Sequence, residues 1–144
     1  MRLKLPTLLF ALVLLLSGAP VQAHLAFFLK PAEHPGTVGN EVVFTGTLIN
    51  TSRTETLFLN NIQLNFINSA DGQFTTDTNV FFANVPGILR PAETYRGVVF
   101  AIVLNPATPP GRCFGIVAIQ GGANIFSTTT LGTQPWGFRF LCRR

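Results

Sequence analysis

The chain has 144 residues, of which 47% are hydrophobic and only 11% are charged, and its formal net charge is +4. This length suits one domain with its own core. The apolar content argues against a disordered chain, and the scattered basic residues argue against a nucleic-acid-binding protein.

The amino terminus has the pattern of a secretory signal peptide. Arg2 and Lys4 give it a positive start, and an unbroken apolar stretch follows at 8–16. Val21 and Ala23 then occupy positions −3 and −1 of a cleavage site. A membrane anchor is the alternative, but a spanning helix needs about 20 apolar residues, roughly twice this run.

We therefore predict two regions: a signal-peptide helix at 1–23, cleaved after Ala23, and a secreted or periplasmic domain at 24–144. Cleavage removes two basic residues, so the formal charge falls to about +2. Nothing in 24–144 is apolar over a length that spans a bilayer. We expect the mature chain not to cross the membrane.

The domain then alternates short apolar runs with turn residues. Residues 25–29 form an apolar run, and His34-Pro35-Gly36 is typical of a turn. Residues 42–48 alternate apolar and polar with period two, which predicts a strand with one buried face. A second strand is expected over 57–67, where the alternation changes phase near Asn60 and predicts a bulge.

Further strands are predicted towards the carboxyl end. We expect a turn at 69–72 and a short strand at 80–83. A proline-containing turn within 89–97 leads into the β-branched run 98–104, which predicts a central strand buried on both faces. The remaining strands are expected at 113–119, 125–131 and 136–142, with Trp136 and Cys142 on the buried face of the last.

This pattern of seven or eight short strands, with no helical periodicity after the signal, predicts an all-β domain. The favoured architecture is an immunoglobulin-like antiparallel β-sandwich. A jelly roll or a small barrel is the alternative.

Several segments also resemble a known family. They read GTLINTS at 46–52, ETLFL at 55–59, LRPAETYRG at 89–97 and PPGRCFGIVAIQGG at 109–122. Together they are similar to the Ig-like β-sandwich domains of bacterial secreted and PEP-CTERM-type surface proteins. The resemblance implies a structural or binding role without defined chemistry. The last residues, FLCRR, do not match the sorting tail of that family, so we expect no anchoring through such a tail.

Cys113 and Cys142 are the only cysteines. In an exported chain such a pair predicts a disulfide. The closed loop of about thirty residues corresponds to roughly 3–4 kcal/mol in the chain-entropy model. Two free thiols are the alternative in a compartment that forms no disulfides.

No motif predicts catalysis. A serine triad needs His24 or His34 near Ser52, Ser69 or Ser127 and a carboxylate, and no motif marks any of these serines as a nucleophile. We therefore predict no catalytic residue and no bound cofactor, and we expect the protein not to be an enzyme.

Copper binding is the alternative. Cleavage after Ala23 makes His24 the first residue, and its amine and imidazole together suit divalent copper. His34 is the only second histidine available. It reaches His24 only if the chain reverses at Lys30-Pro31.

The favoured function is an exported, non-enzymatic Ig-like module for binding or assembly at the cell envelope or outside the cell. Its partner is an unidentified protein or a component of the envelope or matrix. Five aromatic residues are either core residues or a partner surface: Phe27, Phe28, Phe81, Phe82 and Trp136.

Overall fold

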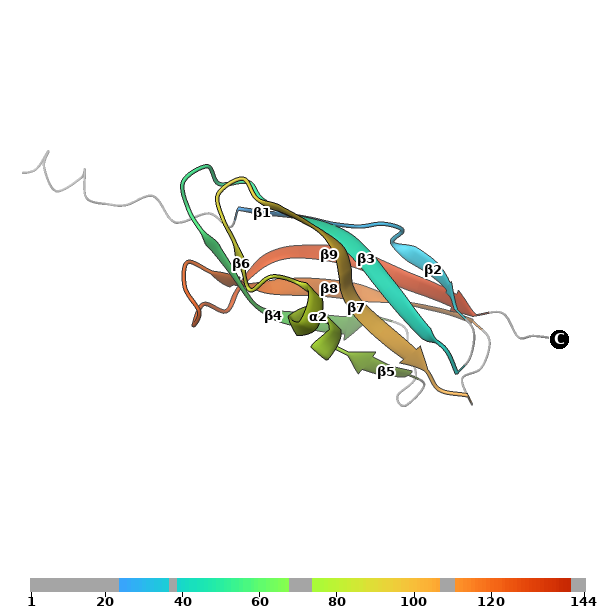
Figure 1. Ribbon diagram of the computed structural model, residues 1–144. Coiled ribbons are helices and arrows are strands. Elements are labelled where there is room, and N and C mark those ends of the chain that lie inside the picture. Colours follow the sequence, from blue (N-terminus) through green and yellow to red (C-terminus); the bar gives the residue numbers. More distant parts are fainter. Residues whose placement is uncertain (1–23, 37–38, 68–73, 107–110, 141–144) are drawn as a thin grey trace, which may run out of the picture.

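The computed structural model describes residues 24–36, 39–67, 74–106 and 111–140. These residues contain nine strands and one short helix (Figure 1). The predicted signal peptide and the turn at 69–72 lie outside them. In chain order the elements are β1 (Leu25–Leu29), β2 (Glu33–Gly36), β3 (Glu41–Asn50), β4 (Leu57–Phe66), β5 (Phe74–Asp77), α2 (Asn79–Asn84), β6 (Ile88–Leu89), β7 (Thr94–Leu104), β8 (Gly111–Gly122) and β9 (Thr129–Phe140).

The strands form two sheets that pack face to face. One sheet has the order β1-β3-β7-β5 and the other β2-β9-β8-β4-β6. Every pairing is antiparallel except that of β2 with β9. This is the division of strands of an immunoglobulin-like sandwich, and the predicted fold class is confirmed.

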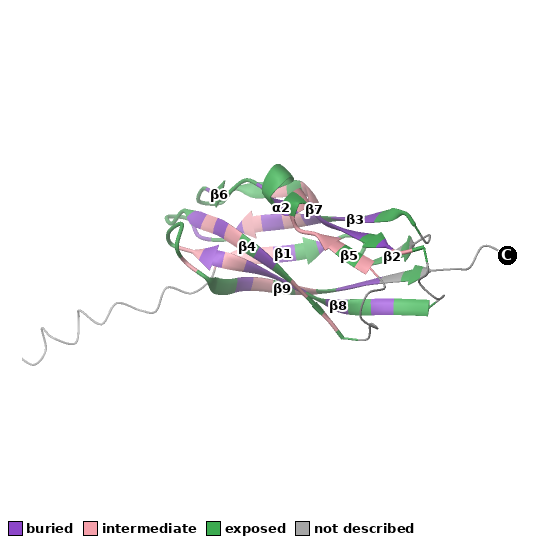
Figure 2. Cartoon of the chain, turned by 90° about the horizontal axis from the view of Figure 1, so that it is seen from below, coloured by how far each residue is buried: buried purple, intermediate pink, exposed green. Residues whose placement is uncertain are grey.

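The core lies between the sheets because apolar residues occupy alternate positions along the strands. In β3 the buried positions run in steps of two, and Figure 2 shows this alternation as bands along the strands. Trp136 of β9 meets Phe44 and Phe100 of the opposite sheet edge to face, at ring-centroid distances of 5.8 and 5.9 Å. Phe44 and Phe100 stack on each other at 4.5 Å.

The first two strands belong to different sheets. β1 pairs with β3, and the chain then crosses to the other sheet, where β2 runs parallel to β9. The predicted turn at His34-Pro35-Gly36 is therefore wrong, because these residues lie in β2. β2 is an edge strand, where the missing amide hydrogen of Pro35 need not interrupt a ladder.

The predicted strand at 80–83 is also wrong, because helix α2 occupies this segment. Asp77 Oδ1 accepts a hydrogen bond from the Asn79 N–H at 3.0 Å and so supports the first turn. The helix places Phe81 in the core, 1% exposed, and leaves Phe82 56% exposed. No helix among the described residues has the length and hydropathy needed to cross a bilayer.

Two other predictions are confirmed. The register of β4 against β8 shifts between Leu59 and Asn61, which is the bulge that the phase change indicated. β7 lies between β3 and β5 in its sheet, and its residues 99–102 are buried on both faces. Helix α2 packs against β7 and lies beside it (Figure 1).

The close approach of β8 to Trp136 makes Gly115 a sensitive position. A Cβ atom there would lie 2.8 Å from Cζ2 of Trp136 and would overlap the backbone oxygen of Asn65. We expect Gly115→Ala to lower the free energy of unfolding by about 1–3 kcal/mol, measured by urea denaturation. The control is Gly87→Ala, where a Cβ meets no atom within 4 Å. Equal stability of both variants would contradict the expected overlap.

Candidate functional site

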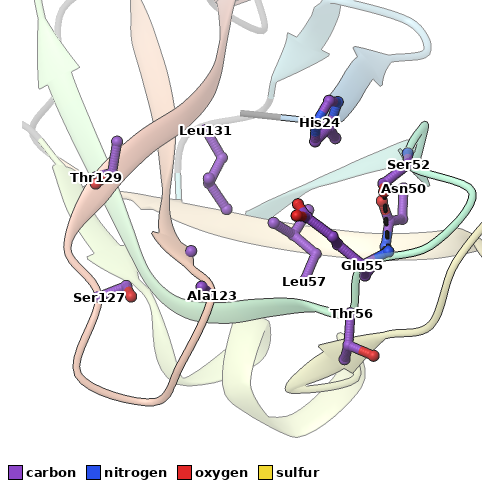
Figure 3. A pocket seen from close by; sticks show the side chains of 11 residues that line it. His24, Asn50, Ser52, Glu55, Thr56, Leu57, Ala123, Ser127, Thr129 and Leu131 are labelled. Carbon is purple, nitrogen blue, oxygen red and sulfur yellow. Dashed lines mark hydrogen bonds between the residues drawn. The ribbon is translucent and has the colours of Figure 1, made fainter. Parts of the chain in front are cut away.

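A pocket of about 460 Å³ opens at one end of the sandwich, where β1, β4 and β9 begin and β3 and β8 end. Its walls come from the start of β1, the β3–β4 loop and the β8–β9 loop (Figure 3). The lining residues are His24, Asn50, Ser52, Glu55, Thr56, Leu57, Gly122, Ala123, Ser127, Thr129 and Leu131.

The β3–β4 wall is held by the amide of Asn50, which is completely buried. Its Nδ2 donates to the backbone oxygens of Glu55 at 2.8 Å, Leu89 at 3.0 Å and Arg90 at 3.1 Å. Its Oδ1 accepts the N–H of Ser52 at 3.0 Å. One side chain therefore joins the end of β3, the loop that follows and the end of β6.

Two further contacts fix the rim. The Oγ of Ser52 accepts the N–H groups of Thr54 and Glu55, at 3.3 and 3.0 Å. The backbone oxygen of His24 accepts both the N–H and the Oγ1–H of Thr51, at 2.7 and 2.9 Å. His24 and Glu55 thus lie on segments whose backbones are anchored to neighbouring strands.

The β8–β9 wall is braced by the bulge in β4. The Nδ2 of Asn60 donates to the backbone oxygens of Asn124 and Ser127, both at 2.9 Å. Within the loop, the Ser127 N–H donates to the Asn124 oxygen at 3.1 Å. Gly122 has a φ of +150° and lies so close to Ser127 that a Cβ would come within 2.6 Å of Ser127 Cβ. The predicted bulge therefore serves to support the pocket.

The pocket combines an apolar floor with a polar rim. Leu57 and Leu131 are buried and contribute the floor. The rim offers the imidazole of His24, the carboxylate of Glu55 and the hydroxyl of Thr129, together with the hydroxyls of Thr56 and Ser127. This volume and this mixture of groups are typical of small-molecule sites.

The two predicted copper ligands are not brought together. His24 lines the pocket, and the adjacent Leu25 lies against Gly132 of β9. His34 pairs with Phe138, six residues further along the same strand. At about 3.3 Å per residue this is a separation of roughly 20 Å. The chain does not reverse between β1 and β2, so the two histidines cannot share one ion, and no group of three potential metal ligands occurs among the described residues.

The pocket does gather His24, Ser52, Glu55 and Ser127, which are the residue types of a hydrolytic triad. Among the described residues no hydrogen bond joins the His24 imidazole to either serine or to the carboxylate. Ser52 is instead used by the turn that it caps, because its oxygen accepts two backbone N–H groups.

Cys113 is buried in β8 and faces the core. Its predicted partner, Cys142, lies outside the described residues, so the disulfide stays a prediction. Cys113 pairs with Phe138 across the ladder. A bond to Cys142 therefore requires the chain to fold back after Phe140, because the Cα atoms of a disulfide lie within about 7 Å of each other.

Sequence reasoning did not single out Asn50, although a signal was present. Asn50 continues the inward positions of β3 that Phe44 and Leu48 occupy. A polar residue at such a position needs internal hydrogen-bond partners, which indicates a structural junction. Glu55 and Thr129 carried no comparable signal, because nothing in the sequence tells which loops share one end.

The comparisons with known proteins add no family. No family model and no curated protein matches the chain. PapD-like domain 7 of human CEP192, an ASH/PapD-like domain, aligns over 85% of this chain and 87% of its own, at 12% identity and a TM-score of 0.47. A family 123 glycoside hydrolase from Clostridium perfringens aligns over 76% of this chain at 14% identity and a TM-score of 0.40. The matched region is 22% of that enzyme. The fold assignment rests on the strand order.

The thiol of Cys113 is expected to be unreactive in the folded, reduced protein. Burial raises its pKa from 9.0 to about 11, so it stays protonated at pH 8, and iodoacetamide reacts with thiolates. We expect Cys113 to be alkylated only after unfolding in urea, as read by mass spectrometry. Because the folded pKa is raised, the linked stability is complete below pH 9 and is lost as the pH rises towards 11.

Two results would depart from this expectation. Rapid alkylation of Cys113 in the native protein would contradict its burial. Absence of alkylation in the unfolded, unreduced protein would instead show the disulfide with Cys142.

Removal of the Asn50 amide is expected to loosen this end of the sandwich. Asn50→Ala removes one hydrogen-bond partner from three carbonyls and one N–H, although the Arg90 oxygen keeps the N–H of Glu93. We expect it to cost about 2–3 kcal/mol of unfolding free energy. The control is Asn61→Ala, because Asn61 donates only to the exposed side chain of Gln120. Hydrogen exchange at residues 51–57 should accelerate in Asn50→Ala alone. Unchanged exchange there would show that other contacts hold the loop.

Proposed function

We propose that this protein is an exported Ig-like module that binds a small ligand in the end pocket and performs no chemistry on it. The observation that carries this proposal is the construction of the pocket. Asn50 and Asn60 hold two of its walls through hydrogen bonds to backbone groups. Walls fixed before binding lower the entropic cost of ordering a site around its ligand.

Export is supported by the signal-peptide pattern at 1–23. The predicted cut after Ala23 would leave the new amino group on His24, whose side chain lines the pocket. The resemblance to secreted surface modules supports a site of action at the cell envelope or outside the cell.

Binding without catalysis is supported by the roles that the polar groups already have. The Ser52 oxygen caps the β3–β4 turn, and Asn50 is satisfied by backbone groups on all sides. Glu55 and Thr129 remain exposed on the rim as hydrogen-bonding groups for a ligand.

The charge of the pocket favours a neutral polar ligand. The carboxylate of Glu55 is offset by the ammonium group that processing would create on His24. The remaining donors and acceptors are hydroxyls and an imidazole, above the apolar floor of Leu57 and Leu131. Hydroxyl groups on one side and an apolar face on the other describe a saccharide unit, and we propose this ligand class.

The proposal is tested with neutral mono- and disaccharides as probes, monitored by two-dimensional NMR of the purified protein. We expect at least one probe to shift the resonances of residues 55–57 and 129–131. Thr129→Tyr places a large side chain in the pocket and should weaken binding at least about tenfold.

The matched control is Thr133→Tyr, at an exposed position on the same strand. It should bind as the unmodified protein does. The proposed ligand class is wrong if no probe shifts these resonances, and the proposed site is wrong if Thr129→Tyr binds normally. Release of a reaction product from any probe would instead favour an enzyme.

A further inference from the structure

The tip of the β8–β9 loop presents two large apolar side chains to solvent. Ile125 is 63% exposed and Phe126 is 84% exposed, the highest values among the exposed large hydrophobic residues. They are consecutive, and they follow the pocket-lining residues Gly122 and Ala123. They do not line the pocket of their own chain.

Hydrogen bonds fix the backbone of the loop that carries these side chains. The Phe126 N–H donates to Asn124 Oδ1 at 2.9 Å, and the Asn124 N–H donates to Ser127 Oγ at 3.3 Å. Asn60 fixes both ends of the turn from the neighbouring strand. An exposed aromatic residue on a rigid turn loses little conformational freedom on binding, which is the property of an interface anchor.

We propose that Ile125 and Phe126 insert into the end pocket of a second copy, which reciprocates to form a two-fold dimer. The tip and the pocket lie at the same end of the sandwich (Figures 1 and 3). Two copies facing each other end to end can therefore each give a tip and receive one. When both parts belong to one surface patch, the assembly closes as a dimer and does not grow into a fibre.

The chemistry of the two surfaces supports a second copy as the occupant. The pocket has an apolar floor at Leu57 and Leu131 and a volume of about 460 Å³, which is larger than an aromatic side chain. The segment 121–130 contains no charged residue, so two identical loops approach each other without like-charge repulsion. A membrane is disfavoured, because the loop offers no Lys or Arg to anionic head groups.

The dimer competes with the proposed ligand, because tip and ligand occupy the same space. It rests on the geometry of the pocket and the tip and does not depend on the ligand's identity. Only a few side chains per copy are buried, so we expect an equilibrium that depends on protein concentration.

The test is sedimentation velocity of the purified protein from micromolar to millimolar concentration. We expect a concentration-dependent dimer, and we expect Phe126→Ser to weaken self-association at least about tenfold. The matched control is Phe28→Ser, which removes another exposed phenylalanine, 54% exposed, from β1. The proposal is overturned if the unmodified protein stays monomeric at every concentration. It is also overturned if the Phe126→Ser variant self-associates as strongly as the unmodified protein.

A second variant tests the destination of the tip. Thr129→Tyr keeps the tip but fills the pocket, and we expect it to lose self-association as Phe126→Ser does. If Thr129→Tyr still dimerises, the tips meet elsewhere and docking into the pocket is wrong. A monomer that binds lipid vesicles through Phe126 would also overturn the second copy as the occupant.

Circular dichroism of each variant confirms that loss of the dimer is not loss of the fold. The saccharide probes are also applied to Phe126→Ser. If Phe126→Ser binds a saccharide and the unmodified protein forms no dimer, only the proposed dimer is refuted. If the unmodified protein forms a dimer and Phe126→Ser binds no saccharide, only the proposed ligand is refuted.

Discussion

The structure depends on the contact of Trp136 with Phe44 and Phe100 across the two sheets. These rings connect β9 of one sheet to β3 and β7 of the other, and Phe66 of β4 adds an edge-to-face contact with Trp136 at 5.1 Å. The domain has no described cross-link between its sheets, so apolar burial and ring packing hold them together. Because this cluster holds the two sheets against each other, it also brings together the loops at their ends.

The pocket end is organised by a different kind of interaction. The inward positions of β3 are apolar until Asn50, where a buried amide replaces the hydrophobic side chain. Asn50 ties the β3–β4 loop to the end of β6, and Asn60 ties the β8–β9 loop to the bulge in β4. The side-chain amides of Asn50 and Asn60 thus hold the β3–β4 and β8–β9 loops in place as walls of the pocket. A rigid end of this kind presents both a concave surface, the pocket, and a convex one, at Ile125 and Phe126.

Much of the fold could be predicted from the sequence, because period-two patterns mark β3, β4 and β9 directly. The bulge was visible for the same reason, since one extra residue reverses the alternation. The strand predicted at 80–83 was wrong because four residues are too few to distinguish a strand from a helical turn. The helix forms because it buries Phe81 where α2 packs against β7. The turn predicted at His34-Pro35-Gly36 was wrong because residues typical of turns are also tolerated in an edge strand such as β2. The site could not be predicted, because its walls are 24, 50–57 and 122–131, and only the strand order brings these segments together.

The division of the first strands between two sheets has a consequence for how the domain resists aggregation. β1 covers the outer edge of β3, and β2 covers the outer edge of β9. One continuous segment of about a dozen residues therefore supplies a short edge strand to each of the two sheets. Removal of this segment would leave the longer strands β3 and β9 as the edges of the two sheets, and long exposed edges recruit strands from other molecules. The segment that sets one edge of each sheet is thus also the one that follows the predicted processing site directly.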